Sequence, residues 1–250
     1  MRRFVKHKFT FLIFFCLFSF NFKAQQKIQK LIENKKFTWK KDTLSSNIYI
    51  YHENSISKEK SVELEKIVQS QILQTIKFLG IAQYKKPIHY FIVDNREKMK
   101  LLLGRETNGT ANYKENYITA IYSEHINSVS SNHELFHLMA MNIWGTTELW
   151  LNEGMAVYSD NLWNGHQIDK FSKFLIDNNK YISITKIAKN VRKYDSNTTY
   201  PLLGSFVKFL EKKYGREFII DLWEHTSKIN RINIKILEKE WIDNLNSIKY

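Results

Sequence analysis

The chain has 250 residues, of which 43% are hydrophobic and 25% are charged, and its formal net charge is +13 at pH 7. Only two prolines are present and no repeat or low-complexity segment stands out, which argues against long disordered linkers. The single cysteine is Cys16, so the chain beyond it can form no disulfide, thiol nucleophile or cysteine-ligated zinc site. Acidic residues are interleaved with the basic ones, and no stripe of Lys, Arg and aromatic residues predicts binding to nucleic acid.

Residues 1–24 have the pattern of an export signal. Four basic residues within the first eight positions precede an apolar run from Phe9 to Phe22, and Ala24 is the small residue at the predicted cleavage site. The run of roughly 12–14 residues is shorter than the ~20 of a membrane span, although an uncleaved anchor is the alternative. Cleavage would remove five basic residues, lower the net charge from +13 to +8, and release residues 25–250 as a periplasmic or secreted protein without stable membrane insertion.

Up to about Asn127, strand and helix patterns alternate. Alternating β-branched and aromatic residues predict strands, and apolar residues three and four positions apart predict a helix that Gly80 ends. Residues 25–127 are therefore predicted to form an α/β half with a small sheet. The predicted strands are Asn47–His52, Pro87–Val93 and Tyr113–Tyr122, and the predicted helices are Ser57–Leu79 and Arg96–Leu103.

Residues 128–250 are predicted to be helical, because strand patterns nearly vanish there. The chain as a whole is thus expected to be an α+β protein. A cleft at the junction of the two halves is the expected place for a functional site. The predicted helices span about residues 130–144, 148–162, 167–178, 200–214, 216–226 and 233–248.

The segment His133-Glu134-Leu135-Phe136-His137 has the pattern H-E-x-x-H. Residues four apart on a helix lie on one face, so the imidazoles of His133 and His137 can bind one zinc ion. Glu134 then lies beside the metal without binding it, and can take a proton from a zinc-bound water. The alternative for Glu134 is a capping box with Ser131 at the helix N-terminus.

A catalytic zinc ion needs a third protein ligand, and Glu153 is the predicted one. It lies in the segment Trp150-Leu151-Asn152-Glu153-Gly154-Met155-Ala156, sixteen residues after His137. This gap suits a second helix that packs antiparallel to the first after a turn at residues 144–147. Glu148 and Asp160 are the competing candidates; Asp160 could instead support a ligating histidine from behind or lie at the surface.

These two segments together resemble the gluzincin metallopeptidases, which include thermolysin and the zinc aminopeptidases. The stretch from Tyr200 to Gly215 and the segment Leu237–Trp241 are also similar to compact bacterial peptidase-MA-like domains, so that the resemblance covers about Ser130 to Leu245. It implies a single gluzincin-like domain, one Zn²⁺ held by His133, His137 and Glu153, and Glu134 as the catalytic base. The aminopeptidases usually have 18 residues between the second histidine and the glutamate, whereas this chain has 15, from Leu138 to Asn152.

The same resemblance implies a phenol or imidazole that stabilises the developing oxyanion. Tyr200 is the candidate, with Tyr194 and Tyr158 as alternatives, while a structural role for Tyr200 is equally compatible with its position. The chain has no G-x-M-E-N segment before His133, which favours an endopeptidase over an aminopeptidase. The strand at Tyr117–Tyr122 is expected to pair with the backbone of the substrate.

The sequence therefore predicts a zinc-dependent peptidase that acts on a peptide or protein substrate. One alternative is a catalytically silent zinc-binding or peptide-binding envelope protein on the same fold, which would have no need of Glu134. The other is a basic interaction protein of the cell envelope, which would bind no stoichiometric metal.

Overall fold

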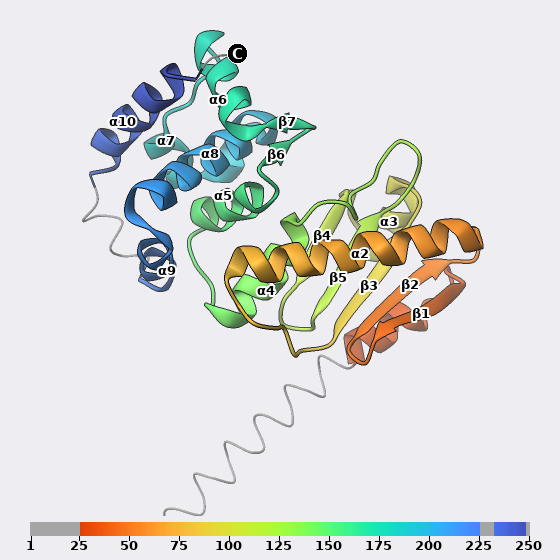
Figure 1. The fold of residues 1–250 in the computed structure, drawn as a ribbon. Coiled ribbons are helices and arrows are strands. Elements are labelled where there is room, and N and C mark those ends of the chain that lie inside the picture. The colour runs from red at the N-terminus through yellow and green to blue at the C-terminus, as the bar shows by residue number, and fades with distance from the viewer. Residues whose placement is uncertain (1–25, 226–232, 249–250) are drawn as a thin grey trace, which may run out of the picture. The chain divides into compact units, whose positions relative to one another are not determined.

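The computed structural model describes residues 26–225 and 233–248, so the predicted export signal lies outside the described residues (Figure 1). The chain forms two compact units. Among the described residues, the first unit contains those up to Gln69 and Lys85–Val129, and the second contains Ser70–Tyr84 and those from Ser130 onward. None of the helices in the described ranges is both long and apolar enough to cross a membrane.

The first unit is built on a five-stranded sheet with the order β1-β2-β3-β5-β4. The three central strands, β2, β3 and β5, are mutually parallel, and β1 and β4 join them antiparallel at the two edges. The strands span β1 (Trp39–Ser45), β2 (Ile48–Glu53), β3 (Ile88–Val93), β4 (Gly109–Asn112) and β5 (Tyr117–Ile121).

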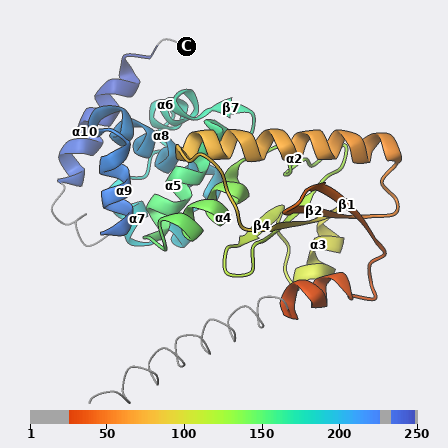
Figure 2. The same ribbon diagram turned by 60° about the horizontal axis from the view of Figure 1, so that its bottom comes forward.

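Helices cover both faces of this sheet (Figure 2). The helix α2 (Lys58–Leu79) lies on one face with Leu64 and Val68 fully buried. On the other face, α3 (Arg96–Leu103) and the helical residues 26–32 enclose a second core. Its buried members are Leu31, Phe37, Tyr51, Phe91, Val93, Met99, Leu102, Tyr117 and Ile121.

The second unit is almost wholly helical. Its longest element, α8 (Ser196–Tyr214), packs against α5 (Leu149–Asp160), α6 (Ile168–Asp177) and α9 (Arg216–Glu224). A two-stranded hairpin joins α5 to α6. The remaining elements are α4 (His133–Ile143), β6 (Leu162–Trp163), β7 (His166–Gln167), α7 (Ile184–Lys189), the 3-10 helix η1 (Val191–Lys193) and α10 (Ile234–Asn246).

The α+β class, with a small sheet in the N-terminal half and helices in the C-terminal half, is confirmed. Some boundaries were wrong. The strand predicted at Tyr113–Tyr122 begins only at Tyr117, because residues 113–116 form a turn in which Asn116 has a φ of 51°. The edge strands β1 and β4 were not predicted. They are short or rich in exposed charged residues, as edge strands commonly are.

The position of β5 changes one functional expectation. Both edges of β5 are already paired, with β3 on one side and β4 on the other. A substrate strand therefore has no free edge to join on β5. Pairing of Tyr117–Tyr122 with a substrate backbone is therefore not supported. Among the described strands, β4 is the edge strand at this side of the sheet.

Candidate metal centre

Two consecutive helices of the second unit carry the predicted metal ligands. The first, α4, begins at His133 and ends at Ile143. Trp144 follows at the C-cap position, and Gly145 then takes a left-handed conformation with a φ of 79°. The Trp223 indole holds this turn by donating a hydrogen bond to the Gly145 carbonyl oxygen at 2.8 Å. The chain then re-enters a helix at Leu149, and Glu153 lies in the second turn of α5.

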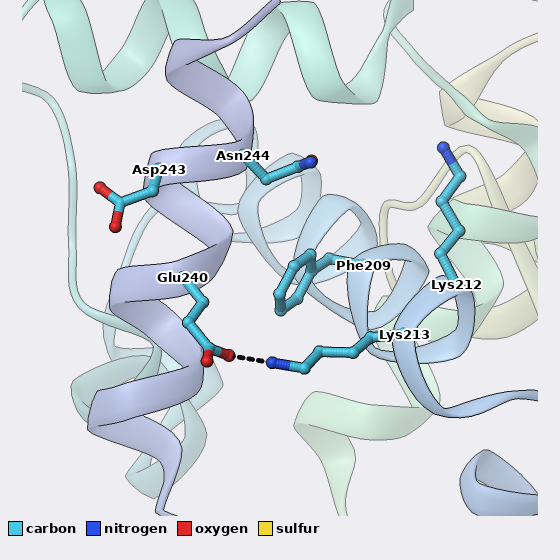
Figure 3. Close-up of a pocket in the computed structure, with 6 residues that line it drawn as sticks. All are labelled: Phe209, Lys212, Lys213, Glu240, Asp243 and Asn244. Carbon is cyan, nitrogen blue, oxygen red and sulfur yellow. Dashed lines mark hydrogen bonds and ion pairs between the residues drawn. The ribbon is translucent and has the colours of Figure 1, made fainter.

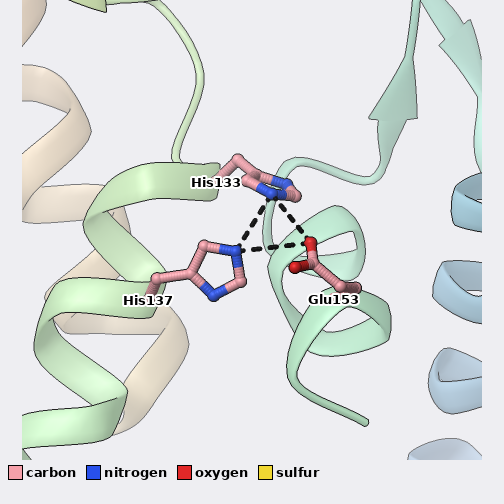
Figure 4. A group of neighbouring side chains, drawn as sticks. All are labelled: His133, His137 and Glu153. Atoms are coloured by element: carbon pink, nitrogen blue, oxygen red, sulfur yellow. Dashed lines mark hydrogen bonds and ion pairs between the residues drawn. The ribbon is translucent and has the colours of Figure 1, made fainter. Parts of the chain in front are cut away.

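The side chains of His133, His137 and Glu153 lie together, with one ligand atom of each within 4.8 Å of the others (Figure 4). The two Nε2 atoms are 3.0 Å apart. The Oε2 atom of Glu153 lies 3.3 Å from Nε2 of His133 and 3.5 Å from Nε2 of His137. Glu148, which caps the N-terminus of α5, and Asp160 are not members of this group.

The geometry of these three atoms fits a zinc ion. A tetrahedral ion with ligands at about 2.0–2.1 Å has ligand atoms about 3.3–3.4 Å apart. The three atoms form a triangle with edges of 3.0, 3.3 and 3.5 Å, so they can occupy three corners of such a tetrahedron. The fourth corner is then left for a water molecule or a substrate, as in catalytic zinc sites.

The pKa values of His137 and Glu153 are both shifted by burial and by their mutual contacts. Burial alone would lower the pKa of His137, but the hydrogen bond with Glu153 and the charges of Glu153 and Glu134 raise it to about 9. Burial would likewise raise the pKa of Glu153, yet the hydrogen bonds and charges of the two histidines hold it well below its usual value. A compact group of this kind strongly favours a positive charge at its centre, which a proton or a metal ion can supply.

Asn152 orients one of the histidines from behind. Its side-chain oxygen accepts a hydrogen bond from Nδ1 of His137 at 2.9 Å, and Asn152 is buried. This bond places the ring proton on Nδ1 and leaves the Nε2 lone pair directed at the cluster. The sequence pattern did not assign Asn152 a role, although its position next to Glu153 was the available signal.

Asp160 fixes the start of α4. Its carboxylate accepts hydrogen bonds from the Ser131 hydroxyl and from the backbone N–H of Asn132, and burial raises its pKa. It is therefore neither a surface residue nor hydrogen-bonded to a histidine ring. The alternative of a capping box with Glu134 is not formed. The N–H of His133 donates to the Ser131 hydroxyl, and the Asp160 carboxylate of α5 accepts the N–H of Asn132.

The predicted base and the predicted oxyanion donor both flank the cluster. The negative charge of Glu134, which is partly exposed, helps to raise the pKa of His137 and of Tyr200. Burial, followed by the charge and the hydrogen bond of Glu153, raises the pKa of Tyr200 well above its ordinary value. The Tyr200 ring is parallel to that of His133, with 6.2 Å between centroids. Tyr158, by contrast, packs against Phe78.

Two glycines allow α5 and α8 to approach closely, and this brings Tyr200 to Glu153. A Cβ atom at Gly154 would lie 2.7 Å from Cγ2 of Val207 and 3.0 Å from the Leu203 carbonyl oxygen. A Cβ atom at Gly204 would lie 2.6 Å from Cγ1 of Val157. The glycine that follows Glu153 is thus required by packing between the two helices.

A separate cavity of about 550 Å³ is lined by residues of α8 and α10 (Figure 3). An ion pair between Lys213 and Glu240 crosses it. None of the predicted site residues lines this cavity. Its other lining residues are Phe209, Lys212, Asp243 and Asn244.

No protein-family model and no curated protein sequence matches the chain. Among solved structures, it is similar to native yeast LTA4 hydrolase, with 16% sequence identity and a TM-score of 0.46. The similarity covers 82% of this chain and 39% of the other, so this chain spans less than half the length of that protein.

Proposed function

We propose that this chain is a zinc-dependent peptidase with a gluzincin-like site. The observation that carries the proposal is the triangle formed by Nε2 of His133, Nε2 of His137 and Oε2 of Glu153, with edges that suit a tetrahedral zinc ion. Two further side chains support the proposal. Glu134 lies on the same helix as the two histidines, and the Tyr200 phenol lies beside the Glu153 carboxylate.

His133, His137 and Glu153 would hold the ion. When bound, zinc would act as a Lewis acid toward a carbonyl oxygen and would lower the pKa of a coordinated water. Glu134 is the proposed base, because it neighbours the cluster and is not one of its members. It takes a proton from the attacking water as the water oxygen bonds to the peptide carbonyl carbon, and it delivers that proton to the amine nitrogen as the C–N bond breaks.

The Tyr200 hydroxyl is the proposed donor to the carbonyl oxygen that becomes negative during the attack. Burial and the nearby carboxylates raise its pKa, so the phenol keeps its proton at neutral pH and can donate a hydrogen bond. A donor of this kind is worth about 10²–10³ in kcat.

We favour an endopeptidase, because the chain has no G-x-M-E-N segment before His133 that would grip the amino terminus of a substrate. Export by cleavage after residue 24 is part of the same proposal and rests on the sequence pattern of residues 1–24 alone.

The experiment compares the wild-type protein with Glu134→Gln and with Glu148→Gln. Glu148 is an exposed residue at the N-cap position of α5 and serves as the matched control. Each is loaded with one equivalent of zinc and incubated with a peptide library whose cleavage is read by mass spectrometry. Half of the library carries acetylated amino termini, which an endopeptidase tolerates and an aminopeptidase does not.

We expect Glu134→Gln to retain stoichiometric zinc and to lose cleavage by at least about a hundredfold, because the base contributes roughly 10²–10⁴. Glu148→Gln should cleave like the wild type. A wild-type protein that holds one zinc ion tightly and cleaves no peptide would instead favour the zinc-binding or peptide-binding protein. Absence of stoichiometric zinc would contradict the metal centre itself.

A further inference from the structure

The hairpin that follows α5 is fixed at its base and at its tip. Asn161 ends α5 in a left-handed conformation, and β6 pairs with β7 immediately afterwards. The turn between them is Asn164-Gly165, with φ values of 49° and 81°, as a tight two-residue hairpin requires. The Asn164 side chain donates to Oδ1 of Asn197 at 3.3 Å, so the tip contacts the first turn of α8.

The N-terminal part of α8 also carries Tyr200 and is weakened by its sequence. Pro201 lies inside the helix and has no N–H, so it cannot donate to the carbonyl oxygen of Asn197 four residues earlier. The turn that holds the phenol therefore lacks one of the hydrogen bonds that would otherwise fix it, and contacts from other elements must compensate.

Trp163 of the hairpin supplies such a contact. Its indole packs on the Tyr200 ring with 5.3 Å between centroids and 60° between ring planes. The buried indole Nε1–H has no hydrogen-bond acceptor among the described residues. Trp163 is thus held against Tyr200 by ring packing, and not by a hydrogen bond to another group.

We propose that Trp163 is a positioning residue that holds the Tyr200 phenol in place beside Glu153, with the hairpin β6–β7 as its rigid support. This inference rests on the proposed function for its effect on catalysis, but the contact between Trp163 and Tyr200 can be tested without any activity. Because β6 follows directly from the helix that carries Glu153, the hairpin links the positions of the carboxylate and the phenol.

The first test is spectroscopic. The purified protein is labelled with 3-fluorotyrosine, and the fluorine NMR signal of Tyr200 is assigned as the one missing from Tyr200→Phe. We expect Trp163→Ala to shift or broaden this signal, in the zinc-free and the zinc-loaded protein, and Trp163→Phe to leave it nearly unchanged because a phenyl ring preserves the packing. Trp163→Leu replaces Trp163→Ala if the latter does not fold.

The second test is a double-mutant cycle in peptide cleavage. Trp163→Ala should lower kcat by roughly tenfold to a hundredfold, within the range of a lost oxyanion donor, with little change in KM and no change in zinc affinity. In the Tyr200→Phe background the same substitution should cost no further kcat, because the group that it positions is already absent. Trp39→Ala, which removes a partly buried tryptophan of the first unit, is the matched control and should leave the Tyr200 signal and kcat near wild type.

An unmoved Tyr200 signal in Trp163→Ala would overturn the positioning role, whether or not the protein cleaves peptides. Additive losses of kcat in the cycle would also overturn it, since a purely structural effect of Trp163 does not depend on the phenol. If the wild type cleaves nothing, the proposed function fails, while the fluorine signal still decides the contact.

Discussion

Each unit of the molecule contains a histidine next to a carboxylate, and the two arrangements differ in one decisive respect. In the first unit, His52 is 1% exposed, with Nε2 2.7 Å from Oδ2 of Asp42 and Nδ1 3.0 Å from the Glu53 carbonyl oxygen. The Ser61 hydroxyl donates to the same Asp42 oxygen at 2.8 Å. Every ring nitrogen of His52 is thus already used within the protein.

In the second unit, His133 and His137 direct their Nε2 atoms at each other and at one oxygen of Glu153. Nδ1 of His137 is hydrogen-bonded to the supporting residue Asn152. The comparison teaches that proximity of histidine and carboxylate does not define a metal centre. A metal centre also needs several lone pairs that converge on one point. The cluster of His52, Asp42 and Ser61 instead links β1, β2 and α2 through hydrogen bonds.

The largest expected contrast comes from removing one histidine of each cluster. His137→Ala should weaken zinc binding by roughly a few hundredfold, since a zinc site worth on the order of 10 kcal/mol loses one of three protein ligands. His52→Ala should leave zinc affinity unchanged and lower the free energy of unfolding by about 1–3 kcal/mol, because Asp42 loses a buried partner. Competition with a chelator measures the first quantity and urea denaturation the second. Equal zinc loss in both variants would break the comparison.

The next largest expected effect is the pH dependence of zinc binding at the cluster of His133, His137 and Glu153. Because the pKa of His137 is about 9 in the metal-free protein, zinc must displace its proton below that pH. Zinc affinity should therefore rise about tenfold per pH unit up to about pH 9 and level off above it, with close to one proton released near pH 7. Calorimetry in buffers of different ionisation enthalpy counts the protons. A pH-independent affinity between pH 7 and 9 would contradict the arrangement.

The same raised pKa has a consequence for stability, and its sign follows from linkage. The contribution of protonated His137 to the stability of the metal-free protein is fully present below its unfolded value of 6.5 and is lost as the pH rises to about 9. The zinc-loaded protein should not show this loss. Thermal unfolding of both forms between pH 6 and 10 checks it, and His137→Ala should abolish the difference.

Removing the supporting amide should have a smaller effect. Asn152→Ala leaves Nδ1 of His137 without its acceptor, and zinc affinity should fall by about 10–100-fold, the usual range for such supporting residues. Asn152→Asp, which keeps an acceptor oxygen, should retain most of the affinity. Zinc affinities within twofold of wild type for Asn152→Ala would show that the ring is oriented by packing alone.

The smallest expected effect concerns the contact between α5 and α8. Gly154→Ala places a Cβ atom 2.7 Å from Val207 and 3.0 Å from a backbone oxygen, which costs about 1–3 kcal/mol in overpacking, and alanine regains about 1 kcal/mol of helix propensity. The net loss of stability should be about 1 kcal/mol, with zinc bound normally. Gly145→Ala, where a Cβ meets nothing within 4 Å but φ is 79°, separates backbone strain from packing.

Several elements were predictable from local patterns. The helix α3 matches its predicted range at both ends, because Asn95 caps its start and Gly104 takes the left-handed conformation at its end. The helix predicted at about 148–162 was too long, since Asn161 takes the left-handed conformation and ends α5 at Asp160. The Asn164-Gly165 dipeptide beyond it is a recognised hairpin signal. The helix predicted from residue 200 begins at Ser196, with Asp195 at the N-cap position and Pro201 inside the helix.

The sequence by itself determined the members of the candidate site. The spacing of His133, Glu134 and His137 follows from the pitch of one helix, and Glu153 needed only a second helix after a turn. Their roles as ligands and base remain predictions until the experiments above are done. Only the tertiary structure decided which residues contact the site residues from behind. Asn152, Asp160 and Trp163 contact His137, Asn132 and Tyr200, which are distant from them along the chain, and no local pattern marks them. The same holds for Gly154 and Gly204, because the need for a residue without a Cβ atom arises only when α5 and α8 pack against each other.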